Sequence, residues 1–187
     1  MKTHILPALR LSLVFIIIIA FVYPAAIYGI AQLQKDKGEG SKISVKGKVV
    51  GFELIGQSFT QARYFQSRPS AVDYNGGGSG GSNKGPTNPE YLAQVEERIA
   101  AFQKENPTVN KPAIPSELVT ASGSGLDPQI SLEAALVQVD RIASTRNIGK
   151  EKIKKLVMDI ENKPLFGLFG PSTINVLDLN IRLDALK

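Results

Sequence analysis

The chain of 187 residues is long enough for one ordinary domain with an appendage. It has no cysteine and a single histidine, His4, which excludes disulfides, thiolate or histidine metal sites and a Ser-His-Asp triad inside a folded domain. The formal net charge of +5 is mild and the lysines gather only in short local clusters, so the composition does not favour nucleic-acid binding.

The first predicted element is an apolar helix over residues 11–34. This stretch, LSLVFIIIIAFVYPAAIYGIAQLQ, has no charged side chain, and its 24 residues span roughly 36 Å as a helix, enough to cross a bilayer core. A cleaved signal peptide is the alternative, but its apolar region would be about 7–15 residues long and would precede a small-residue cleavage site. The pattern therefore favours a retained membrane anchor.

Positive charge flanks both ends of this helix, so the positive-inside rule gives limited guidance on its orientation. Lys2 and Arg10 precede the helix, and Lys35 and Lys37 follow it. A short N-terminal stub most simply stays inside, and long domains are translocated largely regardless of their charge. We therefore expect a single-pass protein of the cell membrane, with a cytoplasmic N-terminus and an extracytoplasmic C-terminal domain.

The sequence behind the anchor predicts one small mixed α/β (α+β) soluble domain. The expected division is a stub over 1–10, the transmembrane helix over 11–34, a linker over 35–44 and the soluble domain over 45–187. A strand is predicted over 45–55, because the apolar residues alternate along it; its inward positions would be Val50, Phe52 and Leu54.

Loop and helix signals then alternate along the chain. Residues 66–89 are rich in Gly, Ser, Asn and Pro and are expected to form a long loop. Residues 90–104 have apolar side chains at helical spacing, and residues 106–118 are Pro-rich and expected to be extended. The helical face over 90–104 would be formed by Leu92, Val95, Ile99 and Phe102.

Three further elements are predicted in the C-terminal third. Asp127 and Pro128 suggest an N-cap for a helix over 131–146, whose inward positions would be Leu132, Ala135, Leu136, Val139 and Ile142. A second helix over 150–161 would be supported by a Glu151–Lys155 pair. After a turn at Gly167, Gly170 and Pro171, residues 173–186 alternate and predict a strand with a bulge between Val176 and Leu177.

A glycine-rich stretch, NGGGSGGSNKGPTNP at 75–89, raises the question of a phosphate site. A Walker A loop needs G-x-x-x-x-G-K-[ST], but here Lys84 is followed by Gly85 and Pro86. The run SGGSN at 79–83 resembles the signature of ABC-type ATPases only faintly, so a structural loop is favoured. The small residues of TASGSGLDP at 120–128 could bind an anion before a helix, but a tight turn and cap is the favoured interpretation.

Several longer motifs indicate a family. They are GQSF at 56–59, YFQSRPSA at 64–71, YN at 74–75, SGGSN at 79–83, GPTN at 85–88, VTASGSGLDPQIS at 119–131 and NVLDLN at 175–180. With Gln138 and Arg141 between them, these motifs closely resemble the C subunits of bacterial Kdp potassium-transporting P-type ATPases. The resemblance covers nearly the whole chain, including the single N-terminal span.

The resemblance implies an accessory, non-catalytic subunit that is needed for assembly of a high-affinity potassium uptake pump. The implied partners are a channel-like potassium-binding subunit, an ATP-hydrolysing P-type subunit, a small membrane peptide and the surrounding lipid. The family has also been described as a catalytic chaperone that raises the affinity of the hydrolysing subunit for ATP. No tightly bound cofactor is implied, although ATP could be engaged within the complex.

Two sets of candidate site residues follow from the resemblance. The nucleotide-binding set would be Ser79, Gly80, Gly81, Ser82 and Asn83, with Gln57 or Gln138 as further candidates. The subunit-contact set, from the loops over 64–89 and 119–128, would be Tyr64, Phe65, Arg68, Pro69, Tyr74, Asn75, Ser122, Gly123, Ser124 and Gly125.

These two roles compete, because a domain outside the membrane would be separated from cytoplasmic ATP by about 30 Å of hydrocarbon. Without the resemblance, a free-standing, anchored extracytoplasmic binding module would be the preferred alternative. A hydrolase is disfavoured because the folded part offers no histidine base.

Overall fold

The computed structural model describes residues 2–186. Its chain divides into two compact units, residues 1–42 and 43–187. The first unit contains a long apolar helix, and the second combines helices with short strands. The predicted class, one N-terminal apolar helix followed by a small mixed α/β domain, is confirmed.

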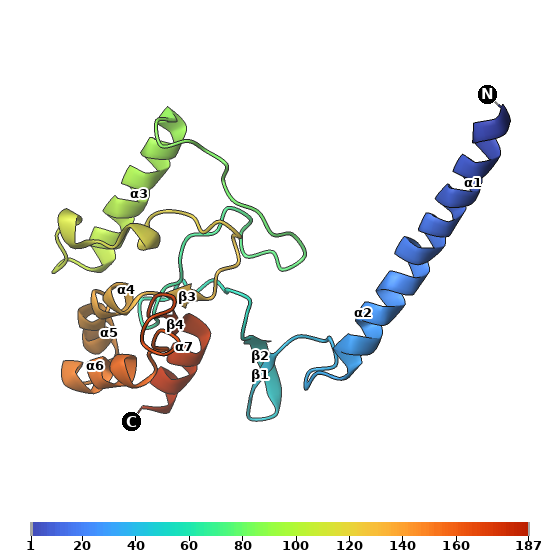
Figure 1. Cartoon of the computed structure of the whole chain (residues 1–187). Coiled ribbons are helices and arrows are strands. Elements are labelled where there is room, and N and C mark those ends of the chain that lie inside the picture. The colour runs from blue at the N-terminus through green and yellow to red at the C-terminus, as the bar shows by residue number, and fades with distance from the viewer. Residues whose placement is uncertain (1, 187) are drawn as a thin grey trace. The chain divides into compact units, whose positions relative to one another are not determined.

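The first unit is one uninterrupted helical rod (Figure 1) made of α1 (Lys2–Ile17), a π-helical turn η1 (Ile18–Val22) and α2 (Tyr23–Gln32). The Tyr23 N–H donates to the Ile18 carbonyl, five residues back, and Pro24 comes directly afterwards. A widened turn at this point accommodates a proline ring that would otherwise clash with the preceding turn. The stretch His4–Gln32 has a mean hydropathy of 2.7, so this helix is long and apolar enough to cross a membrane.

The second unit opens with a hairpin of β1 (Lys42–Val45) and β2 (Lys48–Phe52). Lys46 and Gly47 both have positive φ, as in the type I′ turn that joins twisted strands. The strand predicted over 45–55 is confirmed as β2, but its bounds are wrong, because this turn separates Val45 from β2. The predicted inward residues Val50, Phe52 and Leu54 are exposed. The buried position of β2 is Gly51, where a side chain would collide with Gln57 and Leu177.

No helix or strand interrupts residues 53–88, which confirms the loop predicted over 66–89. The predicted helix is confirmed as α3 (Pro89–Glu105), which begins where the Asn88 side chain accepts a hydrogen bond from the Tyr91 N–H at 3.0 Å. Phe102 is its buried residue, whereas Leu92 is exposed. The Pro-rich stretch after it is not simply extended, since it forms the short 3₁₀ helices η2 (Lys111–Ala113) and η3 (Ser116–Leu118).

The helix predicted over 131–146 is divided in two. After β3 (Gln129–Ile130), α4 (Leu132–Leu136) ends before Gln138, and α5 (Val139–Arg146) follows. The cap is Ser131, whose hydroxyl accepts from the Ala134 N–H at 3.1 Å, so the assignment of Asp127 as N-cap is wrong. Leu136, predicted to point inward, is exposed.

Helix α6 (Lys150–Asp159) confirms the helix predicted there. Its Glu151 pairs with Lys154 at 3.0 Å, at i,i+3 spacing, instead of with Lys155 as predicted. The predicted turn after it is present, with positive φ at Gly167 and Gly170.

The strand predicted over 173–186 is wrong beyond its first residues. Only β4 (Ile174–Asn175) is extended, and it pairs antiparallel with β3. Helix α7 (Val176–Ala185) begins there because the Asn175 side chain accepts from the Asp178 N–H at 3.1 Å. Val176, Leu179 and Leu183 lie at helical spacing and are buried, so the face of a helix had produced an apparent alternation.

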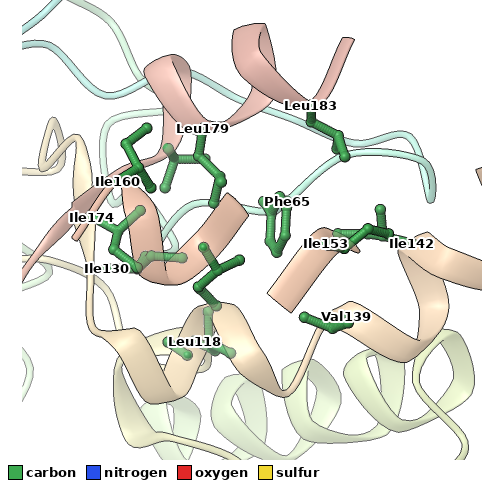
Figure 2. Close-up of a cluster of buried hydrophobic side chains, with 14 of the residues drawn as sticks. Phe65, Leu118, Ile130, Val139, Ile142, Ile153, Ile160, Ile174, Leu179 and Leu183 are labelled. Atoms are coloured by element: carbon green, nitrogen blue, oxygen red, sulfur yellow. The ribbon is translucent and has the colours of Figure 1, made fainter. Parts of the chain in front are cut away.

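The core lies where α6 packs against α4, α5 and α7 (Figure 1). In the close-up, Phe65, which comes from the long loop, points into the middle of the cluster between Leu183 of α7 and the helices below it (Figure 2). Burying each such side chain contributes roughly 1.5–3 kcal/mol. The long loop is therefore anchored to the helical core through Phe65.

Candidate functional site

Two buried amides hold the backbone on either side of the Phe65 side chain. Asn180 of α7 accepts from the Phe65 N–H and donates to the Phe65 carbonyl, both at 2.9 Å. Gln138 accepts from the Gln66 N–H at 2.8 Å and donates to the Gln66 carbonyl at 3.3 Å. The two amides bond the N–H and carbonyl groups of Phe65 and Gln66 as a neighbouring β-strand would. This segment can therefore be buried without belonging to a sheet.

Arg141 of α5 completes this polar cluster. Its side chain, which is 6% exposed, donates to the Asn106 side chain at 3.0 Å, to the Tyr64 carbonyl at 3.0 Å and to Gln138 Oε1 at 2.7 Å. Burial lowers the pKa of the Arg141 guanidinium, and the charge of Glu105 opposes that shift. We call Asn180, Gln138, Arg141 and Asn106 the polar clamp.

The clamp holds the chain at Phe65 and Gln66, where the first of two loops begins. The two loops, residues 66–83 and 119–128, lie against each other and are here called the paired loops. The Ser122 N–H donates to the Pro69 carbonyl at 3.1 Å, and the Gly80 N–H donates to the Ser124 carbonyl at 2.8 Å. The Ser79 hydroxyl donates to the same Ser124 carbonyl at 3.0 Å. The two loops that the sequence singled out separately therefore form one surface.

Gly125 shows how closely the two loops approach. Its φ is +69°, and an added Cβ would lie 2.6 Å from Val72 Cγ2 and 2.7 Å from the Gly80 carbonyl oxygen. Any side chain there would force the loops apart. The neighbouring Gly123 is exposed, and a Cβ built on it would meet no atom of the described residues within 4 Å.

A strained turn projects from the first loop. Asp73 and Tyr74 are consecutive non-glycine residues with φ of 50° and 56°, a conformation that costs on the order of 1–3 kcal/mol per residue. The Ser70 hydroxyl holds the turn by accepting from the Val72 N–H at 3.1 Å and the Tyr74 N–H at 2.9 Å while donating to the Gly125 carbonyl at 2.6 Å. Such strain is typical of functional sites.

Tyr74 and Arg68 stiffen the base of the turn. The Tyr74 hydroxyl donates to the Arg68 carbonyl at 2.5 Å, and Arg68 Nη1 lies 3.0 Å from Asp127 Oδ2 of the second loop. Burial raises the pKa of the Tyr74 phenol, while the charge of Arg98 opposes the shift. Arg68 Nε is buried and has no acceptor among the described residues.

The predicted nucleotide-binding residues lie within the paired loops. Ser79 and Gly80 already donate to the second loop. Gly81 lies close to the same loop, since a Cβ added to it would be 3.0 Å from the Gly123 carbonyl oxygen. Ser82 and Asn83 are exposed. A cleft of about 270 Å³ lies nearby and is lined in part by Pro69, Tyr74, Arg98 and Glu105, but none of residues 79–83 lines it.

The predicted subunit-contact residues fall into three groups. Asn75, Gly123 and Ser124 are exposed on the paired loops, whereas Phe65, Ser122 and Gly125 are buried and offer no side chain to a partner in this fold. The half-buried residues are Tyr64, Arg68, Pro69 and Tyr74. Of these, Tyr64 belongs to another face, since its hydroxyl donates to Asp184 of α7 at 3.0 Å and Arg146 stacks 4.9 Å from its ring centroid.

Asn180 and Asn106 of the polar clamp were not singled out from the sequence. Asn180 lies in a stretch whose alternation predicts a strand, so the sequence does not indicate its buried position on a helix. A sequence signal for Asn180 does exist: it is a polar amide at helical spacing from apolar residues. A buried amide needs a hydrogen-bond partner, so such a position predicts a bond to another part of the chain.

Comparison with known proteins gives matches to one family over nearly the whole chain. Residues 5–185 match the family model described as "K+-transporting ATPase, c chain". A protein of Flavobacterium psychrophilum named "Potassium-transporting ATPase KdpC subunit" is 54% identical over 184 residues, which cover 98% of this chain and 99% of the relative. Proteins with the same name are 52% identical in Flavobacterium johnsoniae, over 96% of both chains, and 43% identical in Bacteroides fragilis, over 100% of this chain and 99% of the relative.

Proposed function

The chain belongs to the KdpC family, the c chain of K+-transporting ATPases, and we propose that it is an anchored, non-hydrolytic accessory subunit whose paired loops dock onto a partner subunit. The partners are those that the family resemblance implies: a channel-like potassium-binding subunit, an ATP-hydrolysing subunit and a small membrane peptide. The observation that carries this proposal is that the exposed edge of the paired loops is fixed by hydrogen bonds and contains the strained turn at Asp73 and Tyr74.

Preorganisation is the physical reason for choosing this surface. Association is opposed by the entropy lost when interface loops become ordered, and a loop that is already fixed loses less. Hydrogen bonds between the loops fix Ser79, Gly80 and Ser124, and the Ser70 hydroxyl fixes the turn that presents Asn75. The exposed edge of the paired loops is therefore suited to a specific contact.

The residues that could act as a nucleophile or a base give little support to a hydrolytic role. The chain has no cysteine, and its single histidine, His4, lies in the apolar helix. The hydroxyls of Ser70 and Ser79 donate to backbone carbonyls, so neither is paired with a base as a nucleophile would be.

Any effect on ATP affinity is proposed to act through contacts between subunits. The Gly80 N–H and the Ser79 hydroxyl, which a phosphate would need, are engaged by the Ser124 carbonyl. Titration of the full-length chain with millimolar ATP should give no saturable signal. Saturable binding that is lost in a Ser82→Ala, Asn83→Ala variant would instead establish direct nucleotide contact.

The docking proposal is tested by adding bulk to the surface without disturbing the fold. Gly123→Arg projects a long side chain from an open position, and Gly149→Arg is the matched control, since a Cβ at either residue meets no described atom within 4 Å. Co-expressed with the other pump subunits, Gly123→Arg should reduce co-purification and potassium-stimulated ATPase activity, whereas Gly149→Arg should reduce neither. Normal assembly of Gly123→Arg would overturn the proposal.

The proposed orientation places the paired loops outside the cell membrane. Because the chain has no cysteine, Ser82→Cys supplies one exposed thiol. A membrane-impermeant maleimide should label it in intact cells, after permeabilisation of any outer membrane, as strongly as in lysed cells. Labelling that requires lysis would place the domain in the cytoplasm and overturn the proposed orientation.

A further inference from the structure

A second surface, remote in sequence from the paired loops, has no part in the docking proposal. Residues 164–171 read PLFGLFGP and are here called the apolar loop. Their four large side chains are largely exposed: Leu165 is 63%, Phe166 83%, Leu168 81% and Phe169 66% exposed. The two phenylalanines alone expose on the order of 300 Å², which approaches the largest apolar patches of soluble monomers.

The apolar loop has a defined shape. Asn162 and Thr173 exchange backbone hydrogen bonds of 2.8 and 3.0 Å at its base, and Leu165 and Phe169 exchange two of 3.0 Å nearer its tip. Phe166 and Gly167, between them, both have positive φ. The left-handed conformation is costly for a bulky residue such as Phe166, where Asn, Asp or Gly would be favoured. The Phe166 side chain is therefore held at the tip of the loop by a backbone conformation that is unfavourable for it.

From these observations we propose that the apolar loop inserts into the surface of the lipid bilayer to which the N-terminal helix anchors the chain. Backbone polar groups that are not bonded internally are costly in hydrocarbon, so a shallow insertion suits a loop in which most N–H groups are bonded. Within the loop, the N–H groups of Leu165, Gly167, Leu168 and Phe169 all donate to loop carbonyls, and Pro164 and Pro171 have no N–H. Among the described residues, only the N–H groups of Phe166 and Gly170 in this loop lack a backbone acceptor.

Lipid fits this loop better than a protein partner does. Protein interfaces are enriched in Tyr, Trp and Arg and form about one hydrogen bond per 100–200 Å². None of the eight side chains of the apolar loop has a hydrogen-bonding group. Lys163 precedes the loop directly, and a cation at this position favours the anionic headgroups of a membrane surface.

The anchor makes such insertion feasible. Nine residues separate the end of α2 at Gln32 from the start of β1 at Lys42, a distance of at most about 30 Å when extended. A unit as long as residues 43–187 has a radius of gyration of roughly 15 Å. The loop is thus confined near the bilayer, where the high effective concentration makes a modest intrinsic affinity sufficient. The loop could reach the bilayer from either side of the membrane, whether or not the paired loops dock onto a partner.

The test uses the full-length chain in vesicles of phosphatidylcholine and phosphatidylglycerol. Phe166→Cys and Leu168→Cys each supply a single thiol for an environment-sensitive fluorophore, and Ser82→Cys on the paired loops is the control, because the same label there reports any affinity of the dye itself for lipid. If the loop inserts, the labels at 166 and 168 lie about 5–10 Å into the boundary between headgroups and acyl chains. Lipids brominated at that depth should quench these two labels and leave the label at 82 unquenched.

Two outcomes would overturn the proposal. Equal exposure of all three labels to aqueous iodide, in vesicles and in the assembled pump, would show that the loop stays in water. Shielding of 166 and 168 that develops only in the assembled pump, without quenching by lipid, would identify a protein subunit as the occupant. Far-UV circular dichroism of each labelled variant confirms that the fold is intact.

Discussion

Helices α4–α7 are held together by buried apolar side chains, whereas the paired loops are held by hydrogen bonds to backbone atoms. In the helices, Ile142 and Ile153 are wholly buried. In the loops, hydroxyls and N–H groups such as those of Ser70, Ser79 and Gly80 make the contacts. Stability therefore resides mainly in the helices, while the loops are ordered by a few specific bonds to each other and are joined to the helices where the polar clamp holds Phe65 and Gln66.

The largest effect is expected in the helical core. Ile142→Ala should lower the free energy of unfolding by about 2–5 kcal/mol, because it removes buried apolar surface and leaves a cavity. Leu92→Ala, at an exposed position of α3, is the control and should change stability by no more than about 0.5 kcal/mol. Urea unfolding of the full-length chain in detergent, followed by far-UV circular dichroism, measures both. Similar values for the two variants would refute the assignment of the core.

The polar clamp should show the next largest effect. Asn180→Leu leaves the buried Phe65 N–H without its acceptor and should cost about 1–3 kcal/mol. Asn110→Leu is the control, since the Asn110 side chain makes no capping bond. Hydrogen exchange should accelerate over residues 56–83 more than over α4–α6 in Asn180→Leu. Uniform acceleration would mean that the clamp does not specifically order the loops.

An effect of similar size to that of the polar clamp is expected where the loops touch each other. Gly125→Ala should cost on the order of 1–3 kcal/mol, because φ is positive there and the new Cβ would collide with Val72 and the Gly80 carbonyl. Gly123→Ala should change stability by only a few tenths of a kcal/mol, as the position is open. Thermal unfolding of the pair compares them directly, and equal melting temperatures would contradict the close approach of the loops.

The smallest effect is expected at the ion pair across the loops. Arg68 and Asp127 are both partly exposed, so Asp127→Asn should cost no more than about 1 kcal/mol, and added salt should reduce the difference from the native chain. The amide can still accept from the Gln129 N–H, which Asp127 Oδ1 accepts now at 3.0 Å. A loss of several kcal/mol that is insensitive to salt would show that this pair does more than join the loops.

The sequence alone was sufficient for the features that depend on local composition. The apolar run over 11–34, the loop over 66–89 and the helix over 90–104 were predicted because hydropathy, turn residues and helical spacing act over short stretches. The long motifs also identified the family, which the match over residues 5–185 confirmed.

Errors arose where distant contacts override local pattern. The apolar alternation over 173–186 suggested a strand, yet the cap at Asn175 and burial of Leu179 and Leu183 against the other helices select α7. On β2, the apolar residues remain outside because Gly51 is the position that packs against Gln57 and Leu177. A pattern of period 2 cannot indicate which face will find a partner.

In the candidate site, too, local sequence indicates the loops but not the contacts that join them. Glycine and serine content predicts a loop over 75–89 and a tight turn over 120–128, because small residues permit tight backbone geometry wherever they occur. That the two loops bond to each other through Ser124, and that Asn180 and Gln138 fix the backbone of Phe65 and Gln66 from across the core, was decided only by the tertiary structure. Hydrogen bonds between residues more than forty positions apart depend on how the helices pack, and no local sequence pattern encodes that packing.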